Sequence, residues 1–187
     1  MGKKFKSLIF ALVGVMMFGI VGMVGCTKNS TEMPTEPISP EDKAMTKPEE
    51  YKNMLDEKIK TYMGDIKLST EYDFSDVTDD SKKEVYDAYK KYYTNLDTEL
   101  TNLENELKTN VVKGDAIVDK ANQQIINNIG NLKDVINKNL NELDTNMDSI
   151  LNMSKEDFTN KMKELEKSSY DARVKLQNSI EEAQNSL

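Results

Sequence analysis

Side chains able to do chemistry are few in this 187-residue chain. The sequence has no histidine and one cysteine, Cys26, which excludes Ser-His and Cys-His nucleophile pairs and the common His- or Cys-based zinc sites. Carboxylates are abundant, but glycosidase chemistry needs two of them across a cleft, and no Gly-rich phosphate-binding loop occurs. The sequence therefore predicts a non-enzymatic protein with no catalytic residue, no metal and no cofactor.

One group of oxygen-bearing side chains has the spacing of a calcium loop. It starts at Asp73 and ends at Glu84, with Ser or Asp at positions 3, 7 and 9 of the loop. Position 5 is Val77, however, and Thr78 stands where such a loop needs glycine. Helix-capping acids explain the pattern better than a metal site does.

The segment 85–93 combines tyrosines with lysines. Tyr89 and Tyr92 follow the apolar periodicity, whereas Tyr86 and Tyr93, seven residues apart, fall on its flank. A tyrosine ring offers a flat apolar area with a polar tip, which suits a glycan or a peptide. Tyr86 and Tyr93 are thus a candidate binding patch, and packing at the boundary of the core is the simpler alternative.

The first 25 residues have the pattern of an export signal. Residues 1–7 are short and basic, residues 8–25 are uninterrupted by charge, and the chain turns polar directly after Cys26. The lysines before the apolar stretch stay in the cytoplasm, so the rest of the chain is expected on the opposite side of the membrane. About 18 apolar residues also just suffice to span a bilayer, so an uncleaved anchor is the alternative.

The segment Met23-Val24-Gly25-Cys26 resembles the lipobox of bacterial lipoproteins, with Met23 where leucine is usual. The resemblance implies that a diacylglycerol is attached to the sulfur of Cys26, and that residues 1–25 are cut off as a signal peptide. The mature protein would then be held at the cell membrane by several fatty acyl chains such as palmitate, on its extracytoplasmic face.

Two regions of different composition follow the predicted lipidation residue. Residues 26–46 are polar and spaced by prolines, which predicts a disordered tether. Residues 47–187 contain no proline after Pro48, so no proline breaks a helix in the rest of the chain. Helix starts are expected at Thr46 with Glu49, at Ser81 with Glu84, and at Ser154.

Apolar residues in 47–187 recur in steps of mostly four and three, and many lie eleven residues apart. This period predicts nearly straight, long helices rather than a left-handed coiled coil. The expected fold is an all-α bundle of antiparallel helices, three long and one shorter at the N-terminal side. Gly114 either breaks the chain between two helices or lies inside one very long helix, and the break is favoured. The eleven-residue series is Val85, Leu96, Leu107, Val118, Ile129, Leu140, Leu151 and Met162.

Asparagines are dense between positions 122 and 146, and most of them are expected to face away from the core. Accordingly, Leu140 is predicted to be a buried core residue and its neighbour Asn139 an exposed one. The simple interpretation is a solvated helix face, and a polar binding face is the alternative.

The charge of the chain limits its partners. The net charge is −8, and removing the three lysines of residues 1–25 leaves 22 basic against 33 acidic side chains, or −11. Such a surface repels nucleic acid and disfavours lying flat on anionic lipid.

The expected function is binding or structural support in the cell envelope, with cell wall or an envelope protein as partner. In its short, helical architecture the chain resembles the cell-wall-binding lipoproteins of Firmicutes. The alternatives are an immunity-type lipoprotein that captures a cationic peptide, and self-association.

Overall fold

A computed structural model describes residues 44–187 except 65 and 67. The predicted signal peptide, the lipobox with Cys26 and most of the tether lie outside the described residues. Residues Met45–Leu187 form one compact unit. Its helices are α2 (Pro48–Met63), a 3-10 turn (Asp79–Ser81), α3 (Lys82–Asn110), α4 (Ala116–Leu151) and α5 (Lys155–Ser186). No strand occurs in this part of the chain.

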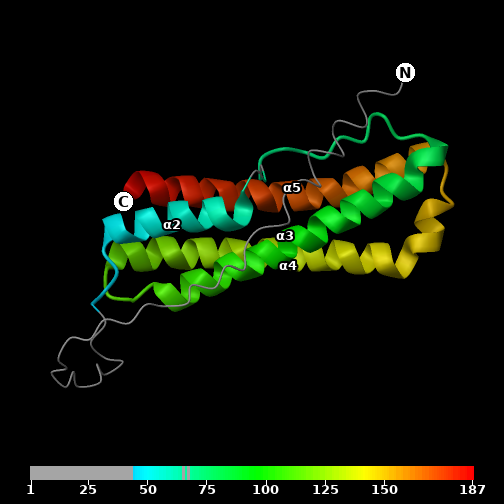
Figure 1. Ribbon diagram of the computed structural model, residues 1–187. Coiled ribbons are helices and arrows are strands. Elements are labelled where there is room, and N and C mark those ends of the chain that lie inside the picture. Colours follow the sequence, from blue (N-terminus) through cyan, green and yellow to red (C-terminus); the bar gives the residue numbers. More distant parts are fainter. Residues whose placement is uncertain (1–43, 65, 67) are drawn as a thin grey trace, which may run out of the picture. The chain divides into compact units, whose positions relative to one another are not determined.

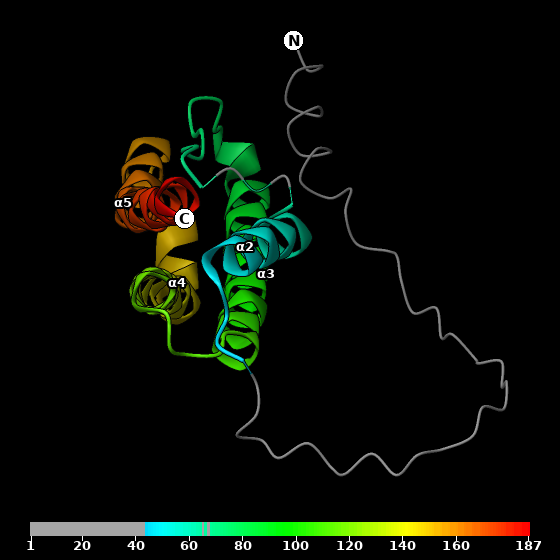
Figure 2. The same ribbon diagram turned by 90° about the vertical axis from the view of Figure 1, so that its left-hand side faces the viewer.

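The three long helices α3, α4 and α5 run side by side in alternating directions (Figure 1). They have 29, 36 and 32 residues. The shorter α2 packs mainly on α3, and it also reaches the other two long helices (Figure 2). The Tyr51 hydroxyl donates to Asn122 on α4 at 3.3 Å, and Gln184 on α5 donates to Asp56 at 2.6 Å. The predicted all-α bundle of antiparallel helices is confirmed.

Gly114 breaks the chain between α3 and α4, as favoured. Its φ of +143° is a conformation that side-chain-bearing residues rarely adopt. The next residue, Asp115, then caps α4, because its carboxylate accepts hydrogen bonds from the backbone N–H groups of Ile117 at 2.9 Å and Val118 at 3.1 Å. Ser154 caps α5 in the same way as predicted, by accepting from Asp157 N at 3.1 Å.

At the other two predicted helix starts the helices do begin, α2 at Pro48 and α3 at Lys82, but the expected side-chain caps do not form. Thr46 does not cap α2: its hydroxyl accepts from Val112 N at 2.8 Å, and its own N–H donates to Val112 O at 3.0 Å. Lys47 takes the cap position instead, and Glu50 accepts from its N–H at 3.2 Å. Ser81 lies in the 3-10 turn before α3 and donates its N–H back to Thr78. In both cases another hydrogen-bond partner competes successfully with the expected cap.

The predicted apolar ladder forms the core along most of its length. Most of its residues on α3, on the first half of α4 and on α5 are buried, although Tyr92, which was expected on the ladder, is only half-buried. Core side chains with no exposure include Leu96, Leu100, Leu103, Leu107, Val118, Ile125, Ile129, Leu132, Ile136, Phe158, Met162 and Leu176.

In the second half of α4 the buried position moves back by one residue at two points of the ladder. Asn139 is only 4% exposed, whereas Leu140 is half-buried, so the predicted roles of these neighbours are reversed. Likewise Ile150 is buried in place of Leu151. Asn146 leaves helical geometry with φ −113°, which turns the last part of the helix relative to the first.

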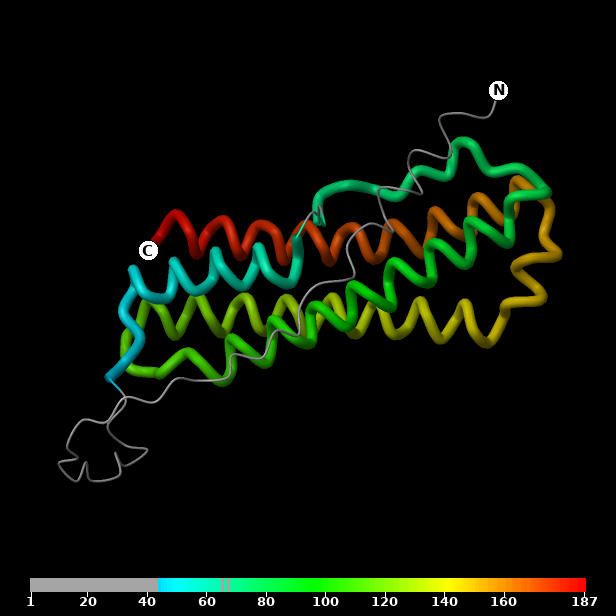
Figure 3. Tube along the Cα trace, in the orientation of Figure 1, coloured from blue at the N-terminus to red at the C-terminus, as the bar shows by residue number. Residues whose placement is uncertain are grey.

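A non-helical segment completes the bundle. Helix α2 ends at Gly64, whose φ is +47°, and so extends along only about half of the long helices (Figure 3). The segment 68–78 continues along the other half. It buries Leu68, Phe74 and Val77, so this loop packs against the domain.

Candidate functional site

Tyr86 and Tyr93 do not form a surface patch, because each is only 1% exposed. The Tyr86 hydroxyl donates to the backbone oxygen of Leu143 at 2.6 Å, and the Tyr93 hydroxyl donates to Glu166 at 2.6 Å. The flank of α3 on which they lie is covered by α4 on one side and by α5 with the loop on the other. The prediction of an exposed pair was therefore wrong, and core packing is the correct interpretation.

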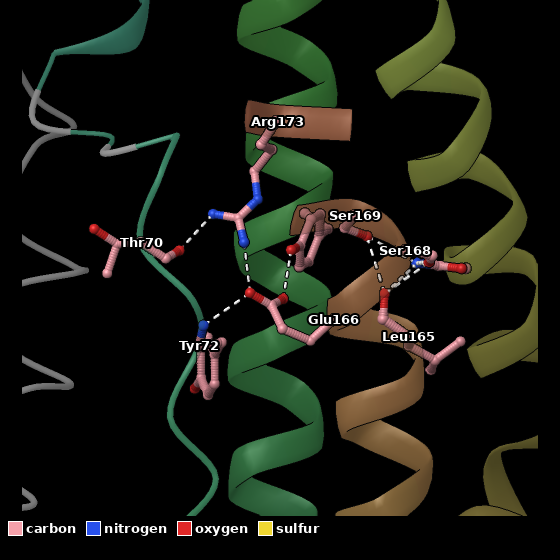
Figure 4. A network of polar contacts seen from close by, with 9 residues as sticks. Thr70, Tyr72, Leu165, Glu166, Ser168, Ser169 and Arg173 are labelled. Atoms are coloured by element: carbon pink, nitrogen blue, oxygen red, sulfur yellow. Dashed lines mark hydrogen bonds and ion pairs between the residues drawn. The ribbon is translucent and has the colours of Figure 1, made fainter. Parts of the chain in front are cut away.

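Tyr93 instead belongs to a buried polar network, drawn in Figure 4, that joins α3, α5 and the loop. Its centre is the carboxylate of Glu166, which also accepts from the backbone N–H of Tyr72 at 2.8 Å and from Arg173 at 2.5 Å. The guanidinium of Arg173 makes a second bond, to the backbone oxygen of Thr70 at 2.7 Å. Two side chains one above the other on α5 thus hold the loop backbone at two points.

Aromatic rings pack beside this network. The ring centroids of Phe74 and Tyr89 lie 5.8 Å apart, and those of Tyr89 and Tyr93 lie 4.6 Å apart. Tyr72 packs edge-on against Tyr89 at 5.6 Å. The loop therefore contributes both backbone hydrogen bonds and aromatic contacts, which together fasten it to α3 and α5.

The contacts within the network affect the pKa values of Arg173 and Tyr93. Burial would by itself lower the pKa of Arg173, but its contacts with Tyr93 and Glu166 outweigh that effect and raise the pKa. Burial also raises the pKa of the Tyr93 phenol, which stays protonated and able to donate. Arg173 is 1% exposed and Glu166 4%, so the ion pair at the centre of the network is shielded from solvent. Its chemistry suits fastening the loop rather than binding a substrate.

Sequence reasoning missed Glu166 and Arg173. Arg173 is the only arginine of the chain, and it lies seven residues, or about two helical turns, after Glu166 on the buried side of α5. A lone arginine between apolar ladder residues was the available signal. A second missed group is Asn139, whose amide donates to Leu165 O at 2.9 Å and to Ser169 Oγ at 2.8 Å.

The surface carries an acidic segment at one end of the bundle, between 71 and 80. It has no basic residue, and all of its acidic side chains are exposed: Glu71, Asp73, Asp76, Asp79 and Asp80. This end lies opposite the turn between α3 and α4, beside which the described chain enters the bundle (Figure 3). No group of three or more potential metal ligands converges within residues 44–64, 66 and 68–187. Val77, at position 5 of the calcium-loop spacing, is buried and carries no side-chain oxygen.

Two grooves follow the outer seam between α4 and α5. The larger has a volume of about 790 Å³ and includes Ile117, Gln124 and Glu182, and the smaller, of about 190 Å³, includes Asn131 and Lys175. Gln124 donates to Glu182 across the seam at 2.9 Å. Ile117 is 54% exposed, which makes it the most exposed large apolar side chain in the described part of the chain.

Comparisons with protein families, with curated proteins and with solved structures found no match to this chain. Among the described helices, none combines the length and the apolar character needed to cross a bilayer.

Proposed function

We propose that the protein is a lipid-anchored, non-enzymatic component of the bacterial cell envelope, which acts on the extracytoplasmic face as a binding or structural protein. The observation that carries the proposal is the position of Cys26. The only cysteine directly follows a basic and apolar leader and precedes a polar, proline-spaced segment. A helical body with its own core follows at Met45–Leu187, as a tethered domain requires.

The geometry of the body supports a tether with a defined point of attachment. Two hydrogen bonds join Thr46 to the backbone of Val112, so the chain enters the bundle at the turn between α3 and α4. The acidic segment 71–80 lies at the opposite end. In a protein anchored through residues 26–44, this opposite end is free to turn away from the membrane and toward a partner.

Metabolic labelling with a fatty acid tests the anchoring. Cys26→Ala is expected to abolish the label and to leave residues 1–25 attached, because both lipidation and cleavage need the thiol. Thr27→Ala, one residue further on, is the matched control and should be labelled like the wild type. Equal label in the wild type and the Cys26 variant would exclude a lipoprotein. An unlabelled wild type that stays in the membrane would favour the uncleaved anchor.

The acidic segment favours one second candidate function, the capture of a cationic peptide. Five exposed carboxylates, of which only Asp79 has a lysine partner among the described residues (Lys82, at 3.2 Å), would attract such a peptide over long range. Affinity should then fall steeply with salt, because exposed charges are screened beyond about 8–10 Å. Asp76→Asn with Asp79→Asn should weaken binding, while the exposed Asp171→Asn on α5 should not. Salt-insensitive binding to purified cell wall would favour a wall partner instead.

A further inference from the structure

One stretch of α4 differs from the rest of the surface. Residues 121–132 contain no Asp, Glu, Lys or Arg, in a chain of which 31% is charged. Their exposed side chains are amides, namely Gln123, Gln124, Asn127 and Asn131. Charge depletion is what distinguishes the centre of a protein interface from ordinary surface. In a strongly acidic body, such a face is also where two copies could approach without repulsion.

Gly130 lies within this stretch and has no role in the fold. Its backbone is helical, and a Cβ atom there would meet nothing within 4 Å. Glycine inside a helix costs about 1 kcal/mol relative to alanine. Because no neighbour fills the space of the missing side chain, packing within the body does not explain a glycine here. A glycine on an open helix surface lets another chain come close.

The stretch is bordered by charges of opposite sign, Lys120 before it and Asp134 after it. Lys120, Asn127 and Asp134 are spaced by seven residues, lie nearly in line along α4 and are all exposed. Neither Lys120 nor Asp134 has an ion-pair partner among the described residues. A second α4 running antiparallel, with a two-fold axis at Asn127, would set each lysine opposite an aspartate of the other copy.

From these observations we infer that the outer face of α4 pairs with the same face of a second copy, antiparallel and centred on Asn127. Lys120 contacts the partner subunit's Asp134, and the same contact recurs by symmetry. Gln123 lies opposite the partner subunit's Gly130, where the missing side chain leaves room. Asn127 meets its own counterpart, and its amide can both donate and accept.

The charges also select the direction of the pair. In a parallel pair with two-fold symmetry each residue lies opposite its own copy, so Lys120 would meet lysine and Asp134 would meet aspartate. Like charges directly opposed destabilise an interface and exclude that arrangement. One helix pair buries little surface, so the association is weak in dilute solution and is favoured at the high local concentration that a membrane anchor provides.

Cross-linking of the full chain in its membrane tests the pairing. Asn127→Cys should give a covalent dimer with a short bis-maleimide. Asn141→Cys is the matched exposed control. In the antiparallel pair the two 141 positions lie about 42 Å apart, at 1.5 Å per residue, and should not react. Equal dimer from both variants would overturn the antiparallel geometry, and no dimer from Asn127→Cys would overturn the pairing.

Charge exchange supplies the specific readout. Adding Lys120→Asp to Asn127→Cys turns two attractive contacts into two repulsive ones and should lower the dimer yield about tenfold. Adding Asp134→Lys as well should restore it to within about threefold. A yield that ignores both changes would refute the inference. Cross-linked dimer from the wild type would instead report a free thiol at Cys26, and hence failure of the proposed lipid anchor rather than of the pairing.

Discussion

Replacing Arg173 by methionine removes the cation from the buried network while keeping most of the side-chain volume. Glu166 would then be left as a carboxylate whose side chain is only 5% exposed, with the hydroxyl of Tyr93 and the N–H of Tyr72 as its remaining donors. Breaking a buried ion pair by removing one partner costs about 3–5 kcal/mol, because the other charge stays buried and uncompensated. The loop backbone also loses its bond at Thr70.

Urea unfolding of the chain from Thr46 onward measures this cost as a change in the free energy of unfolding. The matched control is Lys167→Met on the same helix. Lys167 pairs with Asp171 at 3.2 Å, but their side chains are 77% and 58% exposed. Exposed pairs contribute about 0–1 kcal/mol, so the control should be close to wild type.

A double variant separates the buried charge from the lost contacts. Glu166→Gln combined with Arg173→Met removes both charges while the amide oxygen still accepts from the loop. It should be less destabilised than Arg173→Met alone by about 1–3 kcal/mol. If Arg173→Met costs no more than Lys167→Met, the network does not hold the loop and the reasoning is refuted.

Five further substitutions test other parts of the body, each by urea or thermal unfolding. Asn139→Ala should lower the free energy of unfolding by about 1–3 kcal/mol, because the hydrogen bonds of its side-chain amide are buried. Leu140→Ala should cost less than Asn139→Ala, and the reverse order would contradict the register of α4. Gly114→Ala should cost at least about 1 kcal/mol, because φ is +143°, whereas Gly130→Ala should stabilise the monomer by about 0.5–1 kcal/mol. Burial alone would raise the pKa of Glu104, but hydrogen bonds from two lysines outweigh it and hold the pKa below its usual 4.5. The contribution of ionised Glu104 to stability is therefore complete above that value and lost as the pH falls through the lower pKa of the folded state. Glu104→Gln should lose less melting temperature in acid than the wild type does, and an equal loss in both would exclude this linkage.

The helical bundle was predictable because burial imposes a periodic pattern on the sequence. Leu96, Leu107 and Val118 lie eleven residues apart, and all three are fully buried. Gly114 and Ser154 could be found for the same kind of reason, since their effects on the backbone are local.

The polar interior was not predictable, since its partners are distant in sequence. Arg173 binds Thr70, 103 residues away, and Tyr93 binds Glu166, 73 residues away. No local pattern shows that a polar side chain has such a partner, so Tyr93 was expected on the surface. Thr46 shows the same limit, because Val112, 66 residues further on, competes with the local cap.

Mass spectrometry of the protein purified from its own membrane tests the central claim most directly. We expect an N-terminal peptide that begins at Cys26 and carries the mass of a diacylglyceryl group on its sulfur. A peptide in which an unmodified Cys26 is still joined to Gly25 would contradict the account, because the body would then be held by residues 1–25 and not by lipid.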